Sequence, residues 1–279
     1  MSRPVTSADL RSRKRSNGSE PIVMVTVYDE PSARLADAAG VDLLLVGDSV
    51  ADNVLGYPGS MHVTVDDMAR HTAAVARAKP RALIVGDLPW LSYHTGRRDA
   101  VRNAGTLVRA GAQCVKLEGG VVRTPVVEAI VNAEIPVMGH LGLTPQSLLA
   151  MGGYRVQGKD LEAAKLLVQD AHSLEDAGCF AIVLEGIPDV LADRITRAIA
   201  IPTIGIGAGA STDGQVLVFH DLLGLGDRTA PKFVRQYANL GPVITDAIAR
   251  FAADVRSSDF PGETETYVAT TELREALGE

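Results

Sequence analysis

The stretch at residues 180–186 reads FAIVLEG, an apolar run that ends in a carboxylate followed by glycine. The stretch at residues 114–120 reads CVKLEGG and ends in the same way. Continuous apolar runs, rather than alternating ones, are typical of strands that are covered on both faces, as in a parallel sheet. These two stretches therefore predict buried parallel strands with a charged residue at each carboxyl end.

Working outward from them, we count eight such runs along the chain: Ile22–Val27, Leu43–Val46, Ala82–Val85, Cys114–Leu117, Pro136–Met138, Phe180–Leu184, Pro202–Ile206 and Val216–Phe219. Amphipathic stretches between them predict helices: Thr64–Lys79, Arg98–Ala110, Lys159–Ala177 and Pro188–Ala200. Strand–helix alternation repeated eight times predicts an α/β fold, a closed (β/α)8 TIM barrel. An open, doubly wound sheet is the alternative, because the last run follows its predecessor too closely for a full helix.

No Pro/Gly/Ser linker divides the chain, so residues 1–279 are interpreted as a single barrel domain. The sequence of residues 1–20 predicts a short helix or arm with Ser7 as its N-cap. Extra helices are expected after the last strand, and residues 257–279 are expected to form a surface tail. Glycines at three predicted helix ends are expected to adopt left-handed C-cap conformations: Gly40, Gly111 and Gly178.

The composition excludes several classes of protein. Thirty-four acidic and 27 basic side chains give a net charge of -7, opposite to the balance of a sequence-independent nucleic-acid binder. No apolar run approaches the length that crosses a bilayer, so no membrane association is expected. Cys114 and Cys179 are far apart, which favours buried thiols and a reducing cytoplasm over a disulfide framework.

Carboxylates follow the second, third and fourth predicted strands, which are neighbours in a barrel: Asp48, Asp87 and Glu118. Loops at the carboxyl ends of barrel strands converge on the barrel axis, where active sites are built. Three oxygen donors there suit a hard divalent cation, with Mg²⁺ as the best fit, and zinc would usually recruit histidine or cysteine.

Other strand-end residues suggest supporting roles. Lys116 lies two residues before Glu118 and should point to the same face, either as a structural ion pair or as a cation for a substrate anion. Glu185 follows an apolar run, and apolar surroundings would make it a stronger general base, although a packing glutamate is equally compatible. His140 is expected to form hydrogen bonds. The glycine-rich Gly205–Gly209 is interpreted as close packing rather than a phosphate site.

These strand ends resemble one family, ketopantoate hydroxymethyltransferase. The resemblance rests on ordered segments between about Val5 and Tyr267, including LVGDS at 45–49, VKLEGG at 115–120, HLGLTPQS at 140–147 and GGYRVQG at 152–158. Departures include Gly86 in place of a more usual alanine, residues 51–53, Glu265 where histidine is frequent, and the extension Val268–Glu279.

The resemblance implies a TIM barrel that transfers a hydroxymethyl group from methylenetetrahydrofolate to 3-methyl-2-oxobutanoate in pantothenate biosynthesis. It further implies Mg²⁺ at Asp48, Asp87 and Glu118, and Glu185 as the proton acceptor. Asp48, Ser49, Asp87 and Lys116 are implied to contact the keto acid, and His140 and Tyr28 to support them. Family members form homo-oligomers, typically decamers of two pentameric rings.

Two rival functions compete with this one. The phosphoenolpyruvate mutase/isocitrate lyase group also binds 2-oxo acids through magnesium in a barrel, but should show a lyase-type cysteine or a second acidic cluster after Asp87. A non-catalytic scaffold would have little reason to keep four carboxylates together at the strand ends.

Overall fold

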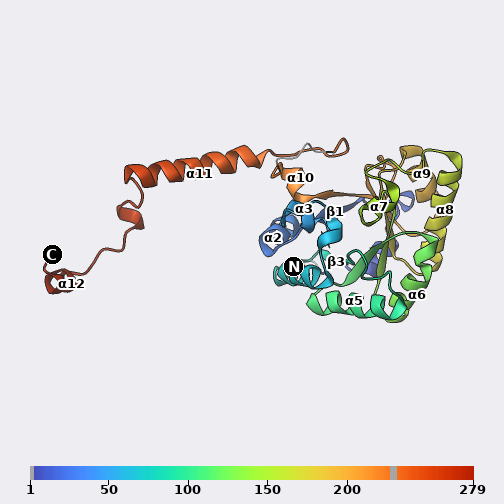
Figure 1. Ribbon diagram of the computed structural model, residues 1–279, viewed down its shortest axis with the longest axis horizontal. Helices are drawn as coiled ribbons and strands as arrows, with labels where there is room; N and C mark the ends of the chain where they lie inside the picture. The colour runs from blue at the N-terminus through green and yellow to red at the C-terminus, as the bar shows by residue number, and fades with distance from the viewer. Residues whose placement is uncertain (1–2, 227–230) are drawn as a thin grey trace.

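The chain forms a closed barrel of eight parallel strands that follow one another in sequence order (Figure 1), in a computed structural model that describes residues 3–226 and 231–279. Strand β1 pairs with both β2 and β8, which closes the barrel and excludes the open-sheet alternative. The strands are β1 Ile22–Thr26, β2 Leu43–Val46, β3 Leu83–Asp87, β4 Cys114–Glu118, β5 Val137–Gly142, β6 Ala181–Glu185, β7 Thr203–Ile206 and β8 Gly214–Val218.

Helices surround the barrel, and these connect consecutive strands: α2 Glu30–Ala38, α4 Val65–Arg77, α5 Arg97–Ala110, α6 Thr124–Asn132, α8 Leu161–Asp176 and α9 Asp189–Ala198. Short helices occupy the loops and the N-terminal segment: α1 Ser7–Arg11, α3 Val50–Asn53, α7 Leu148–Met151 and α10 Phe219–Leu223. The four helices predicted from amphipathic periodicity are confirmed.

The main difference between prediction and structure lies at the strand ends. The predicted strands stop before the charged residues, whereas β3, β4 and β6 include Asp87, Glu118 and Glu185 as their last residues. The backbone ladder continues there because neighbouring strands pair at these positions, as Glu118 does with His140. Pairing depends on the backbone, so a polar side chain does not end the strand.

Apolar side chains pack in two layers. Residues such as Met24, Leu45 and Val183 fill the barrel interior, while a larger layer lies between the strands and the helices. Both cysteines are buried and unpaired, as expected.

The short connection between β7 and β8 contains glycines with left-handed conformations. Gly207 has a φ of 61°, and an added Cβ would lie 2.9 Å from the Phe233 ring. Close packing therefore explains this glycine, in line with the packing interpretation. The left-handed conformations expected at the ends of three helices are also present, at Gly40, Gly111 and Gly178.

The N-terminal segment closes the end of the barrel at which the strands begin. The N-cap of α1 is Thr6 and not Ser7: Thr6 and Asp9 form a capping box, because only Thr6 is three residues before a carboxylate. Leu10 is buried against the barrel interior, and Lys14 forms a buried ion pair of 2.8 Å with Asp213.

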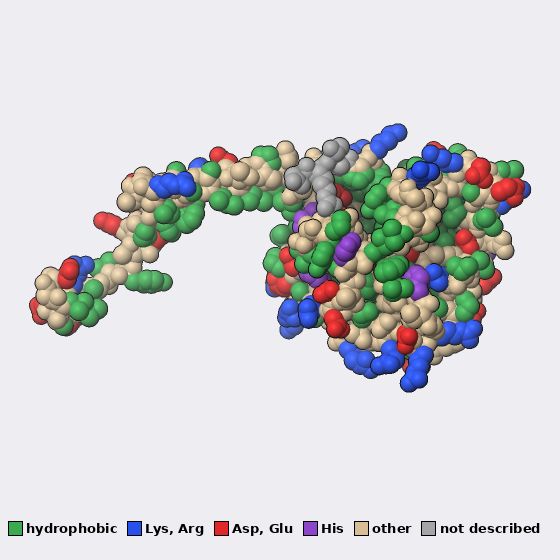
Figure 2. All heavy atoms as spheres, in the orientation of Figure 1, with side chains coloured by type: hydrophobic (Ala, Val, Ile, Leu, Met, Phe, Trp, Pro, Cys, Tyr) green, Lys and Arg blue, Asp and Glu red, His purple; other side chains and the backbone are tan. Residues whose placement is uncertain are grey.

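The C-terminal helices α11 (Leu240–Ser257) and α12 (Thr271–Leu277) extend away from the barrel (Figure 1). Neither helix has a buried residue. A row of hydrophobic side chains nevertheless runs along α11 (Figure 2), at the helical spacing of Ile244, Ile248, Phe251 and Val255. Among the described residues, no helix is both long and apolar enough to cross a membrane.

Candidate active site

The structure brings the predicted charged residues together at the end of the barrel where the strands finish. Asp48 follows β2, Asp87 and Glu118 end β3 and β4, and His140 lies in β5. These four side chains and Lys116 are almost fully buried, with exposures between 2% and 5%. We call these five residues the charged cluster.

Lys116 lies among the carboxylates of the charged cluster. Its Nζ is 2.8 Å from Asp87 Oδ1 and 3.8 Å from Glu118 Oε1. Burial opposes its charge, but the surrounding carboxylates outweigh burial and raise the Lys116 pKa. Lys116 and Glu118 share a face, as predicted, although the closer partner of Lys116 is Asp87.

The carboxylates carry more negative charge than their neighbours balance. Burial, and then repulsion by Asp87 and Glu118, holds the pKa of Asp48 well above its usual value. Burial also raises the pKa of Asp87, although Lys116 opposes that effect. Glu118 differs: burial is outweighed by hydrogen bonding to His140 and by Lys116, which lower its pKa. A bound cation would relieve the repulsion at Asp48 and Asp87.

The residue types of the charged cluster fit a hard divalent cation. Buried carboxylate oxygens on adjacent strands are the donors that Mg²⁺ prefers. In the part of the chain that the structure describes, no three acidic, histidine or cysteine side chains already form a metal-binding group. Lys116 Nζ bridges Asp87 and Glu118 instead, so it would have to shift for both carboxylates to reach one ion.

His140 connects the charged cluster to Glu185. Its Nδ1 lies 3.3 Å from Glu118 Oε1 and its Nε2 lies 3.2 Å from Glu185 Oε2. Burial and Lys116 disfavour protonation, but the two carboxylates outweigh them and raise the His140 pKa to about 9. The side chain of Glu185 is 15% exposed. Its surroundings are therefore less apolar than the sequence suggested, and the His140 imidazole contacts it directly.

Tyr28 and Ser49 form a separate hydrogen-bonded group beside the charged cluster. The Tyr28 hydroxyl lies 2.8 Å from Ser49 Oγ and accepts a hydrogen bond from Asn53 Nδ2 at 3.2 Å. Asn53 also donates to the Ser49 backbone oxygen. Tyr28 therefore orients Ser49, and its hydroxyl makes these contacts rather than contacts to the carboxylates.

Sequence reasoning missed Gln146 and Tyr93. Gln146 donates a hydrogen bond of 2.9 Å from Nε2 to Asp48 Oδ2, and its backbone N–H donates to Glu118 Oε2 at 3.0 Å. Tyr93 donates to Gln146 Oε1 at 2.6 Å. The only sequence signal for Gln146 was its place in the HLGLTPQS segment, which carried the family resemblance. No sequence feature pointed to Tyr93.

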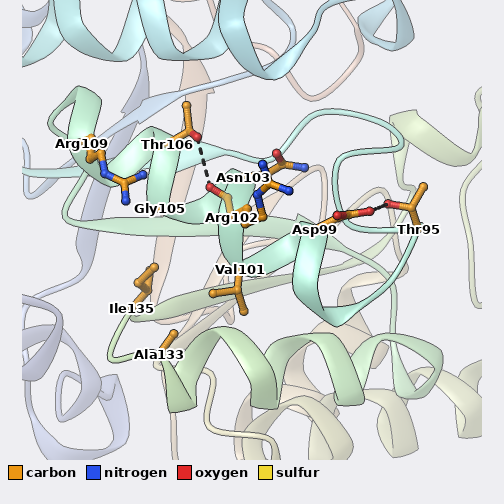
Figure 3. A pocket seen from close by; sticks show the side chains of 10 residues that line it. All are labelled: Thr95, Asp99, Val101, Arg102, Asn103, Gly105, Thr106, Arg109, Ala133 and Ile135. Atoms are coloured by element: carbon orange, nitrogen blue, oxygen red, sulfur yellow. Dashed lines mark hydrogen bonds between the residues drawn. The ribbon is translucent and has the colours of Figure 1, made fainter.

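A groove of about 710 Å³ lies elsewhere, on the outer face of the barrel beside α5 (Figure 3). Its lining includes Arg102 and Arg109 of α5 and Ala133 and Ile135 after α6. As far as the described residues go, none of the predicted site residues lines it, so the groove is separate from the charged cluster.

A closed parallel barrel with buried charged residues at the carboxyl ends of its strands defines a barrel enzyme. A model of the family described as ketopantoate hydroxymethyltransferase matches residues 4–263. The chain belongs to that family.

Relatives named 3-methyl-2-oxobutanoate hydroxymethyltransferase match most of the chain. The one from Moorella thermoacetica is 54% identical over 264 residues, covering 94% of this chain and 97% of its own. The one from Syntrophomonas wolfei is 50% identical over 274 residues, covering 98% and 99%.

Solved structures of other enzymes share the fold. A phosphonopyruvate hydrolase is 14% identical with a TM-score of 0.59, and covers 98% of this chain and 95% of its own. A 2,3-dimethylmalate lyase, described as a member of the PEP mutase/isocitrate lyase superfamily, is 19% identical with a TM-score of 0.57 and the same coverage. At such low sequence identity, the likeness to the phosphoenolpyruvate mutase/isocitrate lyase group shows a shared barrel fold and says nothing about the reaction.

Proposed function

We propose that this protein transfers a hydroxymethyl group from methylenetetrahydrofolate to 3-methyl-2-oxobutanoate, giving ketopantoate (2-dehydropantoate) for pantothenate biosynthesis. Family membership and relatives of that name at 50% identity or more support the reaction. The observation that carries the proposal is the line of contacts from the charged cluster through His140 to Glu185. These contacts connect the carboxylates that would bind a cation to Glu185, the carboxylate that would accept the proton.

Asp48, Asp87 and Glu118 would hold Mg²⁺. When bound, the ion supplies Lewis-acid polarisation of the keto acid, which makes the C3 proton more acidic. Burial and mutual repulsion raise the pKa values of Asp48 and Asp87, and a bound cation would offset both effects, which supports this assignment.

The chain's own residues bind the keto acid and move its proton. Lys116 is the buried cation available to the substrate's negative oxygens, and Ser49, oriented by Tyr28, supplies a hydroxyl. Asp48 and Asp87 lie beside them and would contact the same substrate. The side chain of Glu185 is partly exposed at the mouth of the barrel and would take the C3 proton.

The C–H electron pair then forms the new bond to the methylene carbon of the folate. Both bonds from that carbon to the folate nitrogens break, and water supplies the hydroxyl group. Tetrahydrofolate leaves with its two nitrogens protonated, by the C3 proton and by the second proton of the water. His140 would position Glu185, since its Nε2 is 3.2 Å from the carboxylate.

We further propose that the protein is a homo-oligomer, with the decamer implied by the family resemblance as the assembly. The support is α11, whose apolar side chains Ile244, Ile248, Phe251 and Val255 are 45% to 62% exposed. Such a face is usually covered by a partner. Light scattering should give a mass near 294 kDa, ten times the 29.4 kDa of one chain. A stable, active species of 29.4 kDa would contradict the proposal.

The cytoplasm is the compartment we propose. The two cysteines are unpaired and fully buried, and burial raises the pKa of Cys179 to about 12. Thiols kept in this state suit a reducing environment.

An assay of the purified protein tests the reaction and its cation together. With 3-methyl-2-oxobutanoate, methylenetetrahydrofolate and Mg²⁺, we expect ketopantoate; excess chelator should stop its formation and added Mg²⁺ should restore it. Full turnover in chelator would refute the cation, and no ketopantoate under any metal condition would refute the reaction.

A further inference from the structure

Gln146 reaches the charged cluster from a different part of the barrel than the carboxylates it contacts. It lies in a short 3₁₀ turn, Pro145–Ser147, after β5, and it is 3% exposed. Its Nε2 donates to Asp48 Oδ2 and to the Leu88 backbone oxygen, both at 2.9 Å. Its backbone N–H donates to Glu118 Oε2 at 3.0 Å. One residue thereby links the ends of β2, β3 and β4.

Tyr93 determines which way the Gln146 amide points. The Tyr93 hydroxyl accepts a hydrogen bond from the Glu118 backbone N–H at 3.2 Å, so its single proton is available for Gln146 Oε1 at 2.6 Å. The Leu88 carbonyl oxygen can only accept, which requires Nε2 on the opposite side. Both contacts therefore select the same orientation, in which the amide presents a donor to Asp48.

The group that donates to Asp48, the Gln146 side-chain amide, carries no charge. A lysine or arginine in its place would balance the Asp48 charge, as Lys14 balances Asp213 at the other end of the barrel. An amide orients the carboxylate by hydrogen bonding and leaves its negative charge for a cation.

We propose that Gln146, oriented by Tyr93, is a positioning residue that holds Asp48 in place for the divalent cation. This role rests on the proposed function, because it presumes that the charged cluster binds the ion. It does not place Gln146 in contact with the substrate.

Three variants of the full-length protein test the role. Gln146→Met removes the amide at similar size. Tyr93→Phe removes the hydroxyl that orients the amide and that also accepts a hydrogen bond from the Glu118 N–H. Ser92→Ala is the matched control. Ser92 is buried in the same loop as Tyr93, and it donates to the Pro89 oxygen at 2.7 Å without contacting a carboxylate. Calorimetric titration with Mg²⁺, melting of the metal-free protein and turnover against Mg²⁺ concentration are measured for each.

We expect Gln146→Met to weaken Mg²⁺ binding about 10- to 100-fold, the usual cost of losing a partner of a metal ligand. Tyr93→Phe should weaken binding about tenfold. The loss in the double variant should be smaller than the product of the two single losses, because the Tyr93 hydroxyl acts in part through Gln146. Turnover at saturating Mg²⁺ should recover most of the loss, whereas Ser92→Ala should bind Mg²⁺ like the unsubstituted protein.

Unchanged affinity in Tyr93→Phe and in a folded Gln146→Met would overturn the proposal. An equal loss in Ser92→Ala would also overturn it, since loosening of the loop would then explain the effect. If Gln146→Met does not fold, unchanged affinity in Tyr93→Phe is enough to overturn the proposal. Failure of the unsubstituted protein to bind Mg²⁺ would refute the proposed cation site, and the positioning role with it.

Discussion

The two ends of the barrel bury charge in different ways. Where the strands begin, Lys14 Nζ lies 2.8 Å from Asp213 Oδ2 and donates to the backbone oxygens of Thr196 and Ile201. Asp213 accepts further hydrogen bonds from the backbone N–H groups of Arg15 and Thr203. One positive and one negative group are paired there, and each has additional hydrogen-bond partners.

Where the strands finish, three buried carboxylates face Lys116 and His140, and Glu185 lies beside them. Burial, and then repulsion between the carboxylates, raises the pKa values of Asp48 and Asp87, and Lys116 offsets this rise only in part. The paired charges at the first end are those of a structural ion pair, whereas the unbalanced charge at the second end fits the cation site that we propose.

The largest expected effect is on activity, from Asp87→Ala. This change removes a proposed cation ligand and the closest partner of Lys116, and the loss of several kcal/mol of Lewis-acid stabilisation corresponds to about a ten-thousandfold loss of turnover. Steady-state assays with added Mg²⁺ check it, with circular dichroism as the control for folding. Turnover within tenfold of the unsubstituted protein would show that the charged cluster does not act as a cation site.

Glu185→Gln should slow removal of the C3 proton about a hundred- to ten-thousandfold, because the amide keeps the shape of the side chain but is not a base. Exchange of the C3 proton of 3-methyl-2-oxobutanoate into deuterated water, with Mg²⁺ and without folate, measures this step directly. Binding of the keto acid should be similar in both proteins. Exchange at the unsubstituted rate would assign the base to another group.

At the opposite end, Asp213→Ala should lower the free energy of unfolding by about 3–5 kcal/mol, because it leaves Lys14 buried without its counter-charge. Turnover of the folded fraction should not change. Asp193→Ala is the matched control: its partner Arg197 is exposed on α9, so the loss should be about 0.5 kcal/mol or less. Denaturant unfolding of both variants checks the difference, and equal losses would remove the distinction between the two ends.

The smallest effect is a gain in stability from Asp48→Asn in the metal-free protein. The raised pKa of Asp48 means that its ionised form destabilises the fold at pH values above the ordinary value of 3.8. The cost is absent below that pH, grows as pH rises, and is complete above the raised pKa. At pH 7 the variant should melt about 2–4 °C higher for each kcal/mol relieved.

Melting curves of the metal-free protein between pH 4 and pH 8 test this dependence. The difference between variant and unsubstituted protein should shrink toward acid pH. A variant that melts lower at pH 7 would show that the Asp48 charge is already balanced.

Much of the barrel follows from local sequence. Apolar runs such as the one before Glu185 place the strands, since a strand covered on both faces has no polar side. Because consecutive parallel strands are neighbours, Asp48, Asp87 and Glu118 could be expected at one mouth of the barrel. The short β7–β8 connection made closure the least certain point, and only the pairing of β8 with β1 resolved it.

The partners of each charge were decided by the tertiary structure. Lys116 faces Asp87 more closely than Glu118, Lys14 meets Asp213, and Gln146 enters from the loop after β5. Strand order and side-chain alternation determine which residues share a face, because they depend on backbone geometry that is local in the chain. Which side chains touch depends on how distant loops pack over that face, and no periodicity in the sequence records this.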